Sequence, residues 1–239
     1  MSQILVAWLL ADRARADVLA AAHDGLDDEE RARAARFANA STLRDFVLGR
    51  WLMRSELAKW TGALAAGWRF PLDAHGRPIP RHRDRTAPDT PSINLSHGGG
   101  LVAVVVASDG PVGIDVESVD RELPSRRLDR FLSQEEHAAL AGLEPLARRE
   151  RFWRIWTLKE ALLKARGTGI AGGLASIAFG FDHADRPCIL RRDGADDDAV
   201  EWRLVECRPT ETTRLSIACG GIGAMHGEVR VERRTAAMD

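Results

Sequence analysis

The alternation of apolar and polar positions predicts a chain of short strands separated by helices. An apolar run at residues 4–10 predicts the first strand, and a helical region follows over about 27–59. Proline and glycine break the stretch 71–91 into loops, and the apolar run 101–107 predicts a buried strand. The polar stretch 121–150 reads as helix-rich. Four more short strands are predicted at 177–181, 187–190, 200–207 and 214–218.

The most regular pattern lies in residues 152–169, FWRIWTLKEALLKARGTG. No proline or glycine interrupts the first part of this stretch, and its leucines, alanines, lysines and glutamate favour helix. Gly167 and Gly169 are expected to close the helix, as glycines do at helix C-termini.

One face of this predicted helix carries charged side chains among apolar ones. At 3.6 residues per turn, Trp156, Glu160 and Lys164 form a row, and Trp153 and Leu163 flank it. A carboxylate on such an apolar face must be paired or bound to a metal, because an unpaired buried charge is too costly. Two interpretations therefore stay open: an ion pair between Glu160 and Lys164 within the helix, or a binding site.

The strand 111–117 carries two further carboxylates. It follows Asp109-Gly110, a typical hairpin turn, and is predicted to return beside the preceding strand. Its alternation places Asp115 and Glu117 on the same face. Two carboxylates one repeat apart repel each other unless a cation lies between them. The alternative is a solvent-exposed strand face.

Candidate anion-binding residues precede that strand. Arginines accumulate in the early helical region, at Arg31, Arg33, Arg36 and Arg44. They form either a solvated helix face or a phosphate site, for which guanidinium groups are well suited. Arg77 lies in a tight turn, and the pair Ser96-His97 precedes three glycines. Glycines there would let backbone amides approach a phosphate closely, although a flexible turn explains them equally well.

Composition excludes several classes of protein. With 239 residues the chain fits one large domain or two small ones, and its net charge of -1 gives no reason to expect nucleic acid. The three cysteines form no CxxC pair, which favours a reducing cytoplasm, and no apolar run is long enough to span a membrane. Among 34 basic residues, only Lys59, Lys159 and Lys164 are lysine. Two of these three lie in the long predicted helix.

The stretches INLSH, GIDVE and WTLKEALLK resemble, in that order and spacing, the 4′-phosphopantetheinyl transferases of the Sfp type. Weaker matches are RARAARF, the LGR at Gly49 and HGRPIP. The resemblance implies two pseudo-symmetric α/β halves with coenzyme A bound in the cleft between them. It also implies transfer of phosphopantetheine from coenzyme A to a serine of an apo acyl or peptidyl carrier protein. The reaction would require Mg²⁺ and release 3′,5′-ADP.

The resemblance also implies roles for individual residues, motif by motif. The resemblance implies three magnesium carboxylates: Asp115, Glu117 and Glu160. It implies six coenzyme A-binding residues: Arg33, Arg44, Arg77, Ser96, His97 and Lys164. Among these, Arg77 would hold the 3′-phosphate region and Lys164 would face the transferred phosphate. Lys164 and His97 would act in catalysis by stabilising negative charge on the phosphates. Glu160 or a water held by the site would be the base.

The expectation for the whole chain is an α+β fold with an N-terminal half at 1–110, a C-terminal half with the metal site at 111–230 and a flexible tail at 231–239. We expect a cytoplasmic monomer without nucleic-acid or membrane partners. Two other functions remain open: a Mg²⁺-dependent phosphohydrolase acting on coenzyme A-like pyrophosphates, and a non-catalytic coenzyme A-binding module.

Overall fold

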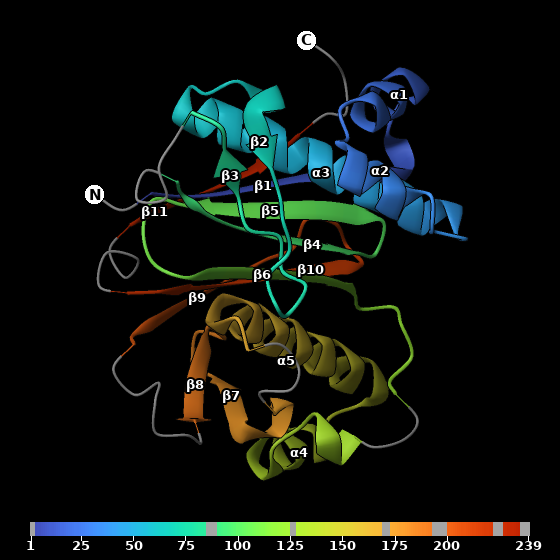
Figure 1. Ribbon diagram of the computed structural model, residues 1–239. Coiled ribbons are helices and arrows are strands. Elements are labelled where there is room, and N and C mark those ends of the chain that lie inside the picture. The colour runs from blue at the N-terminus through green and yellow to red at the C-terminus, as the bar shows by residue number, and fades with distance from the viewer. Residues whose placement is uncertain are drawn as a thin grey trace. The chain divides into compact units, whose positions relative to one another are not determined.

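The computed structural model describes residues 3–84, 90–124, 128–168, 173–192, 200–221 and 227–234 (Figure 1). The chain forms two compact units. Unit 1 comprises Met1–Asp109 together with Gly227–Asp239, and unit 2 comprises Gly110–His226. Helices and antiparallel strand pairs occur in both units, so the fold is α+β, as the sequence predicts. In the described residues, no helix is long and apolar enough to cross a membrane.

Unit 1 is built on a four-stranded sheet with the order β11-β1-β5-β4. Its strands are β1 (Gln3–Leu10), β4 (Ser92–Gly98), β5 (Leu101–Ala107) and β11 (Glu228–Arg233). Every residue of β5 is buried, because β1 and β4 pair with its two edges. Short strands β2 (Trp68–Arg69) and β3 (Arg81–His82) form a separate pair. The strand β4, which carries Ser96 and His97, is an edge strand of the larger sheet.

Three helices accompany this sheet: α1 (Ala16–Asp24), α2 (Asp28–Ala34) and α3 (Ala40–Thr61). The predicted helical region 27–59 is therefore two helices rather than one, and α1 was missed by the sequence reasoning. The side chain of Asn39 starts α3 by accepting from the Ser41 and Thr42 amides, and Gly62 ends it in the left-handed conformation at φ 71°. Asn39 favours a cap over a helix interior, which explains the break.

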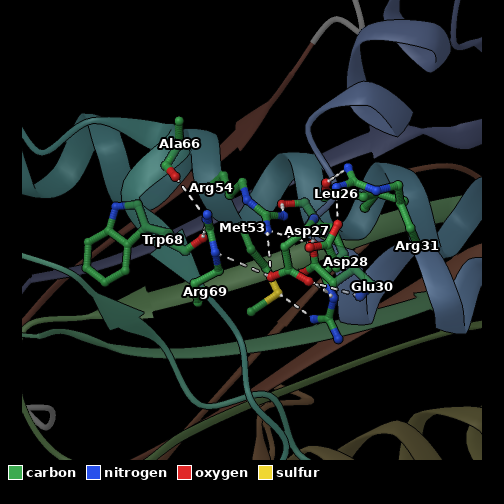
Figure 2. Close-up of polar contacts among 11 residues, drawn as sticks. Leu26, Asp27, Asp28, Glu30, Arg31, Met53, Arg54, Ala66, Trp68 and Arg69 are labelled. Carbon is green, nitrogen blue, oxygen red and sulfur yellow. Dashed lines mark hydrogen bonds and ion pairs between the residues drawn. The ribbon is translucent and has the colours of Figure 1, made fainter.

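A buried charge cluster joins α2 to α3 (Figure 2). Asp27 and Glu30 form a capping box at the start of α2. Glu30 also binds Arg54 at 2.6 Å and Arg50 at 3.2 Å, and all three side chains are almost fully buried. Burial lowers the pKa of Arg50 to about 10. Arg50 and Arg54 therefore fix the two helices together.

The C-terminal segment differs from the sequence expectation. Residues 231–239 were expected to form a flexible tail, but residues 231–233 end strand β11 (Glu228–Arg233), which pairs in parallel with β1. The segment therefore belongs to unit 1 and not to the half with which it is contiguous in sequence. Arg234 follows the strand and binds the buried Glu56 of α3 through two hydrogen bonds of 2.9 and 2.8 Å. Residues 235–239 lie outside the described part of the chain.

We expect Arg234→Ala to lower the free energy of unfolding by about 3 kcal/mol, because it leaves the Glu56 carboxylate buried with a weakened partner. Among the described residues, Lys59 is the other ion-pair partner of that carboxylate, at 3.6 Å. The hydrogen bonds to Glu56 raise the pKa of Arg234. Urea denaturation measures the change. Arg230→Ala removes an exposed arginine of β11 and serves as the control, with stability near the parent's. Equal stabilities of the two variants would contradict the prediction.

Unit 2 is built on a three-stranded sheet with the order β6-β10-β9. The strands are β6 (Val112–Ser118), β9 (Trp202–Cys207) and β10 (Thr213–Gly220). The predicted hairpin at Asp109-Gly110 is wrong: β6 pairs with β10, and β5 has both edges occupied by β1 and β4. The Asp109-Gly110 turn instead marks the boundary of the two units.

The long helix α5 (Pro145–Arg166) packs against β6 and β10, and α4 (Gln134–Ala141) and β7 (Ile177–Phe181) contact α5 as well (Figure 1). β7 pairs with β8 (Pro187–Arg192). Helix α5 starts seven residues earlier than predicted, with Pro145 at its first position, where a missing amide does no harm. Gly167 ends it at φ 73°, as expected, and Gly169 lies outside the described residues.

Candidate functional site

The close approach of α5 to β6 depends on Gly113. A Cβ at this position would lie 2.1 Å from the carbonyl oxygen of Ala161 and 2.5 Å from the amide nitrogen of Ala165. Both contacts are with helix backbone, so no side-chain movement could relieve them. The first residue of the GIDVE motif therefore lets α5 pass directly over the strand that carries Asp115 and Glu117.

Across this contact, Lys164 of α5 meets Asp115 of β6. The Lys164 Nζ donates to Asp115 Oδ1 at 2.7 Å and to the Ile114 carbonyl at 3.1 Å. The Asp115 side chain is 9% exposed and the Lys164 side chain 29%, so the ion pair is buried on the aspartate side. The sequence had offered Glu160 as the ion-pair partner of Lys164, one turn away on the same helix. In the structure the contact of hydrogen-bonding length is with the neighbouring strand.

Glu160 is half-buried on α5. Its Oε1 atom is buried and has no hydrogen-bond partner among the described residues. Burial raises the pKa of Glu160, and the negative charges of Asp115 and Glu117 raise it further. An oxygen that is removed from water, unpaired and surrounded by like charge is a strong candidate for binding a cation.

Glu117 completes the group of carboxylates. It lies on β6, two residues after Asp115, and accepts a hydrogen bond from Arg121 at 2.5 Å. Burial raises the pKa of Glu117, and the charge of Asp115 adds to the increase. The three predicted metal carboxylates are thus close enough to repel one another within unit 2.

The described residues contain no group of three or more His, Cys, Asp or Glu side chains arranged to hold a metal ion. The metal assignment of Asp115, Glu117 and Glu160 therefore stays a prediction. The donors nevertheless fit Mg²⁺, because the ion prefers hard carboxylate oxygens and Glu160 offers an orphaned one. Lys164 supplies the positive charge beside Asp115. A bound ion would either share the Asp115 carboxylate with Lys164 or replace Lys164 as its partner.

In unit 1, the structure brings together two of the predicted phosphate contacts. The Nδ1 atom of His97 lies 3.8 Å from Oδ2 of Asp45, whose Oδ1 lies 3.5 Å from the Nε atom of Arg44. Arg44 also pairs with Asp12 at 2.5 Å. Burial raises the pKa of Asp45. Sequence reasoning missed Asp45, for which adjacency to Arg44 was the only signal. Ser96 precedes His97 on β4 and is buried.

The two remaining arginines lie in different settings. The exposed Arg33 stacks its guanidinium on Phe46, with 5.5 Å between the guanidinium carbon and the ring centroid. Arg77 ends a tight turn in which Asp73 Oδ1 accepts from the amides of His75 and Arg77, and burial lowers the pKa of the Arg77 guanidinium. Neither contact identifies a ligand, so both roles remain predictions.

Two family descriptions match consecutive parts of this chain. Residues 111–218 match the 4′-phosphopantetheinyl transferase superfamily, and residues 13–109 match the N-terminal part of 4′-phosphopantetheinyl transferase. The chain belongs to the 4′-phosphopantetheinyl transferase superfamily.

Two sequence relatives, HetI and psf-1, agree with this membership. The 4′-phosphopantetheinyl transferase HetI of Nostoc sp. (strain PCC 7120) is 32% identical over 202 residues, which cover 83% of this chain and 80% of HetI. The 4′-phosphopantetheinyl transferase psf-1 of Bacillus pumilus is 34% identical, over 79% of this chain and 82% of psf-1. Among solved structures, holo-[acyl-carrier-protein] synthase of Thermotoga maritima matches 46% of this chain and 62% of its own, at 24% identity and a TM-score of 0.39.

Proposed function

We propose that this chain transfers 4′-phosphopantetheine from coenzyme A to a serine of an apo carrier protein, requires Mg²⁺ and releases 3′,5′-ADP. Family membership supports the transferase class and the carrier substrate. The observation that carries the metal part is the buried, unpartnered Oε1 of Glu160 beside two further carboxylates.

In this proposal Asp115, Glu117 and Glu160 hold Mg²⁺. The bound ion would neutralise charge on the pyrophosphate of coenzyme A. Lys164 directs its ammonium to the phosphate being transferred. Glu160, or a water held by the site, takes the proton of the carrier serine.

Coenzyme A itself would be held by basic and polar residues of unit 1: Arg33, Arg44, Arg77, Ser96 and His97. Guanidinium groups bind phosphate oxygens through two parallel hydrogen bonds, which makes arginine suitable for the 3′-phosphate and the pyrophosphate. His97 would stabilise negative charge on the departing 3′,5′-ADP. Because Asp12 and Asp45 neutralise Arg44 in the structure, that arginine would have to exchange these partners for phosphate.

The test is incubation with coenzyme A, Mg²⁺ and several apo carrier proteins, followed by mass spectrometry of each carrier. We expect a mass gain of one phosphopantetheine, loss of that gain in EDTA and recovery with excess Mg²⁺. Asp115→Asn is expected to lower the rate about a hundredfold or more, since a metal contributes several kcal/mol of charge stabilisation. Asp120→Asn changes an exposed aspartate just after β6 and serves as the control.

Each alternative gives a different result. Phosphopantetheine released into solution, with no label on any carrier, would indicate the phosphohydrolase. Coenzyme A binding without turnover would indicate the non-catalytic module. Full transfer by the EDTA-treated protein would contradict the metal assignment.

A further inference from the structure

The second lysine of α5, Lys159, is buried on the side of the helix away from Asp115 and is only 1% exposed. Its Nζ atom donates to the carbonyl oxygens of Phe131, Leu174 and Ile177 at 2.9, 2.7 and 2.7 Å. It also lies 2.6 Å from Oε2 of Glu136, which is fully buried at 0% exposure. The ammonium therefore binds one carboxylate and three backbone groups in the interior of unit 2.

Glu136 extends the network to two more backbone groups. Its Oε2 accepts from the Ser133 amide at 2.8 Å, which completes the capping box of α4, and its Oε1 accepts from the Phe179 amide of β7 at 2.8 Å. The pair thus binds five backbone groups from α4, β7 and the turns that precede them. The groups of Phe131, Ser133 and Leu174 precede α4 or β7, and those of Ile177 and Phe179 lie in β7.

A buried ion pair of this kind is an inefficient source of stability. Desolvation lowers the pKa of Lys159, which shows the penalty on its charge, and apolar residues of similar volume often replace buried pairs without loss. Apolar residues could not hold the five backbone groups in place, because they offer no hydrogen bonds. We therefore explain the ion pair by the backbone positions that it fixes rather than by its contribution to stability.

The Phe131 backbone connects the ion pair to the face of α5 that carries Glu160. The Phe131 carbonyl is bound by Lys159, and the Phe131 ring meets Trp156 edge-on, with the ring centroids 5.0 Å apart and an interplanar angle of 75°. Trp156 lies one helical turn before Glu160 on the same face of α5. Trp156 also contacts the rings of Phe152 and Trp153, so its orientation is set by a packed aromatic group.

We propose that the Lys159–Glu136 pair is a positioning device for the transfer reaction. It holds the Phe131 backbone, and through the Phe131 ring it fixes Trp156 as the wall beside Glu160. The inference rests on the proposed function only in that Glu160 acts in the transfer. Lys159 and Glu136 touch neither coenzyme A nor the carrier.

The test separates stability from positioning. Lys159→Met is expected to lower the melting temperature strongly, because the Glu136 charge loses its partner. The double variant Lys159→Met/Glu136→Leu removes both charges and should regain most of that loss. We expect kcat of the double variant to remain at least tenfold below the parent's, with the KM for coenzyme A changed less than twofold.

Two further variants distinguish loss of the ring contact with Trp156 from a general loss of stability. Phe131→Leu keeps the ion pair and removes the ring contact with Trp156, so it should lower kcat to a similar extent with a smaller change in melting temperature. Leu57→Ala opens a cavity in the core of unit 1, in a cluster that does not include Trp156, and serves as the control. It should lower the melting temperature while kcat stays near the parent's.

A spectroscopic readout does not depend on activity. In protein labelled with 5-fluorotryptophan, the ¹⁹F resonance of Trp156, assigned with Trp156→Phe, should shift in the double variant and in Phe131→Leu but not in Leu57→Ala. An unshifted resonance in the double variant, or recovery of kcat together with melting temperature, would overturn the proposal. Absence of transfer by the parent protein would instead contradict the proposed function, and the ¹⁹F comparison would still test the positioning.

Discussion

Replacing Gly113 by alanine is expected to abolish most transferase activity while leaving the protein folded. The added Cβ would lie 2.1 Å from the Ala161 carbonyl oxygen and 2.5 Å from the Ala165 amide nitrogen. Because both atoms belong to the backbone of α5, the helix as a whole must move away from β6. Overpacking of this kind destabilises by about 1–3 kcal/mol, which a domain of this size can tolerate.

The effect on activity should be much larger. Glu160 and Lys164 lie on α5, whereas Asp115 and Glu117 lie on β6, so a displacement of the helix separates the two parts of the proposed site. A misplacement of about 1 Å can lower an enzymatic rate about a hundredfold. We therefore expect the rate at saturating coenzyme A and carrier to fall at least that far.

The matched control is Gly142→Ala. Gly142 ends α4 at φ -93°, and a Cβ there would meet no atom within 4 Å. Its rate and melting temperature should equal the parent's. A parental transfer rate in Gly113→Ala would show that the spacing of α5 and β6 does not govern the reaction.

Lys164→Gln is expected to lower the transfer rate about a hundredfold or more at saturating substrates. In the proposed site the ammonium faces charge that develops on the phosphate, and such a group contributes several kcal/mol in a water-poor environment. The structure also makes Lys164 the partner of the buried Asp115, so the variant should lose about 1–3 kcal/mol of stability. The loss of stability and the loss of rate therefore need separate measurements.

Mg²⁺ provides that separation. Because the ion and Lys164 would both place positive charge beside Asp115, added Mg²⁺ should raise the melting temperature of Lys164→Gln more than that of the parent. The rate should stay low in the same samples. Lys164→Arg should keep the pair with Asp115 but misplace the charge on the phosphate, because a guanidinium is longer and planar. Near-parental rates for both variants would leave Lys164 with a structural role alone.

The sequence by itself determined the elements that depend on local pattern. The period of 3.6 residues predicted the C-terminal part of α5, and Gly167 ends it because a left-handed position requires a residue without a Cβ. The motifs GIDVE and WTLKEALLK identified the family, and the alternation on β6 placed Asp115 and Glu117 on one face. These features need only the positions of residues along one strand or one helix.

The tertiary structure decided which groups meet. The sequence offered Glu160 as the ion-pair partner of Lys164, but the contact of 2.7 Å is with Asp115, on a strand 49 residues away. A turn signal at Asp109-Gly110 could not show that β6 pairs with β10, because strand pairing depends on which edges are free after the sheets assemble.

The sequence also could not show which groups Lys159 binds. Three of its partners are backbone carbonyl groups, which every residue possesses, so no sequence pattern marks them. The end of β11 was expected to be part of a flexible tail, and it is a strand because β1 offers an edge for backbone hydrogen bonds. Local pattern predicted part of the secondary structure and the residue types available for chemistry, and the pairing of distant groups was fixed only by the packing of the folded chain.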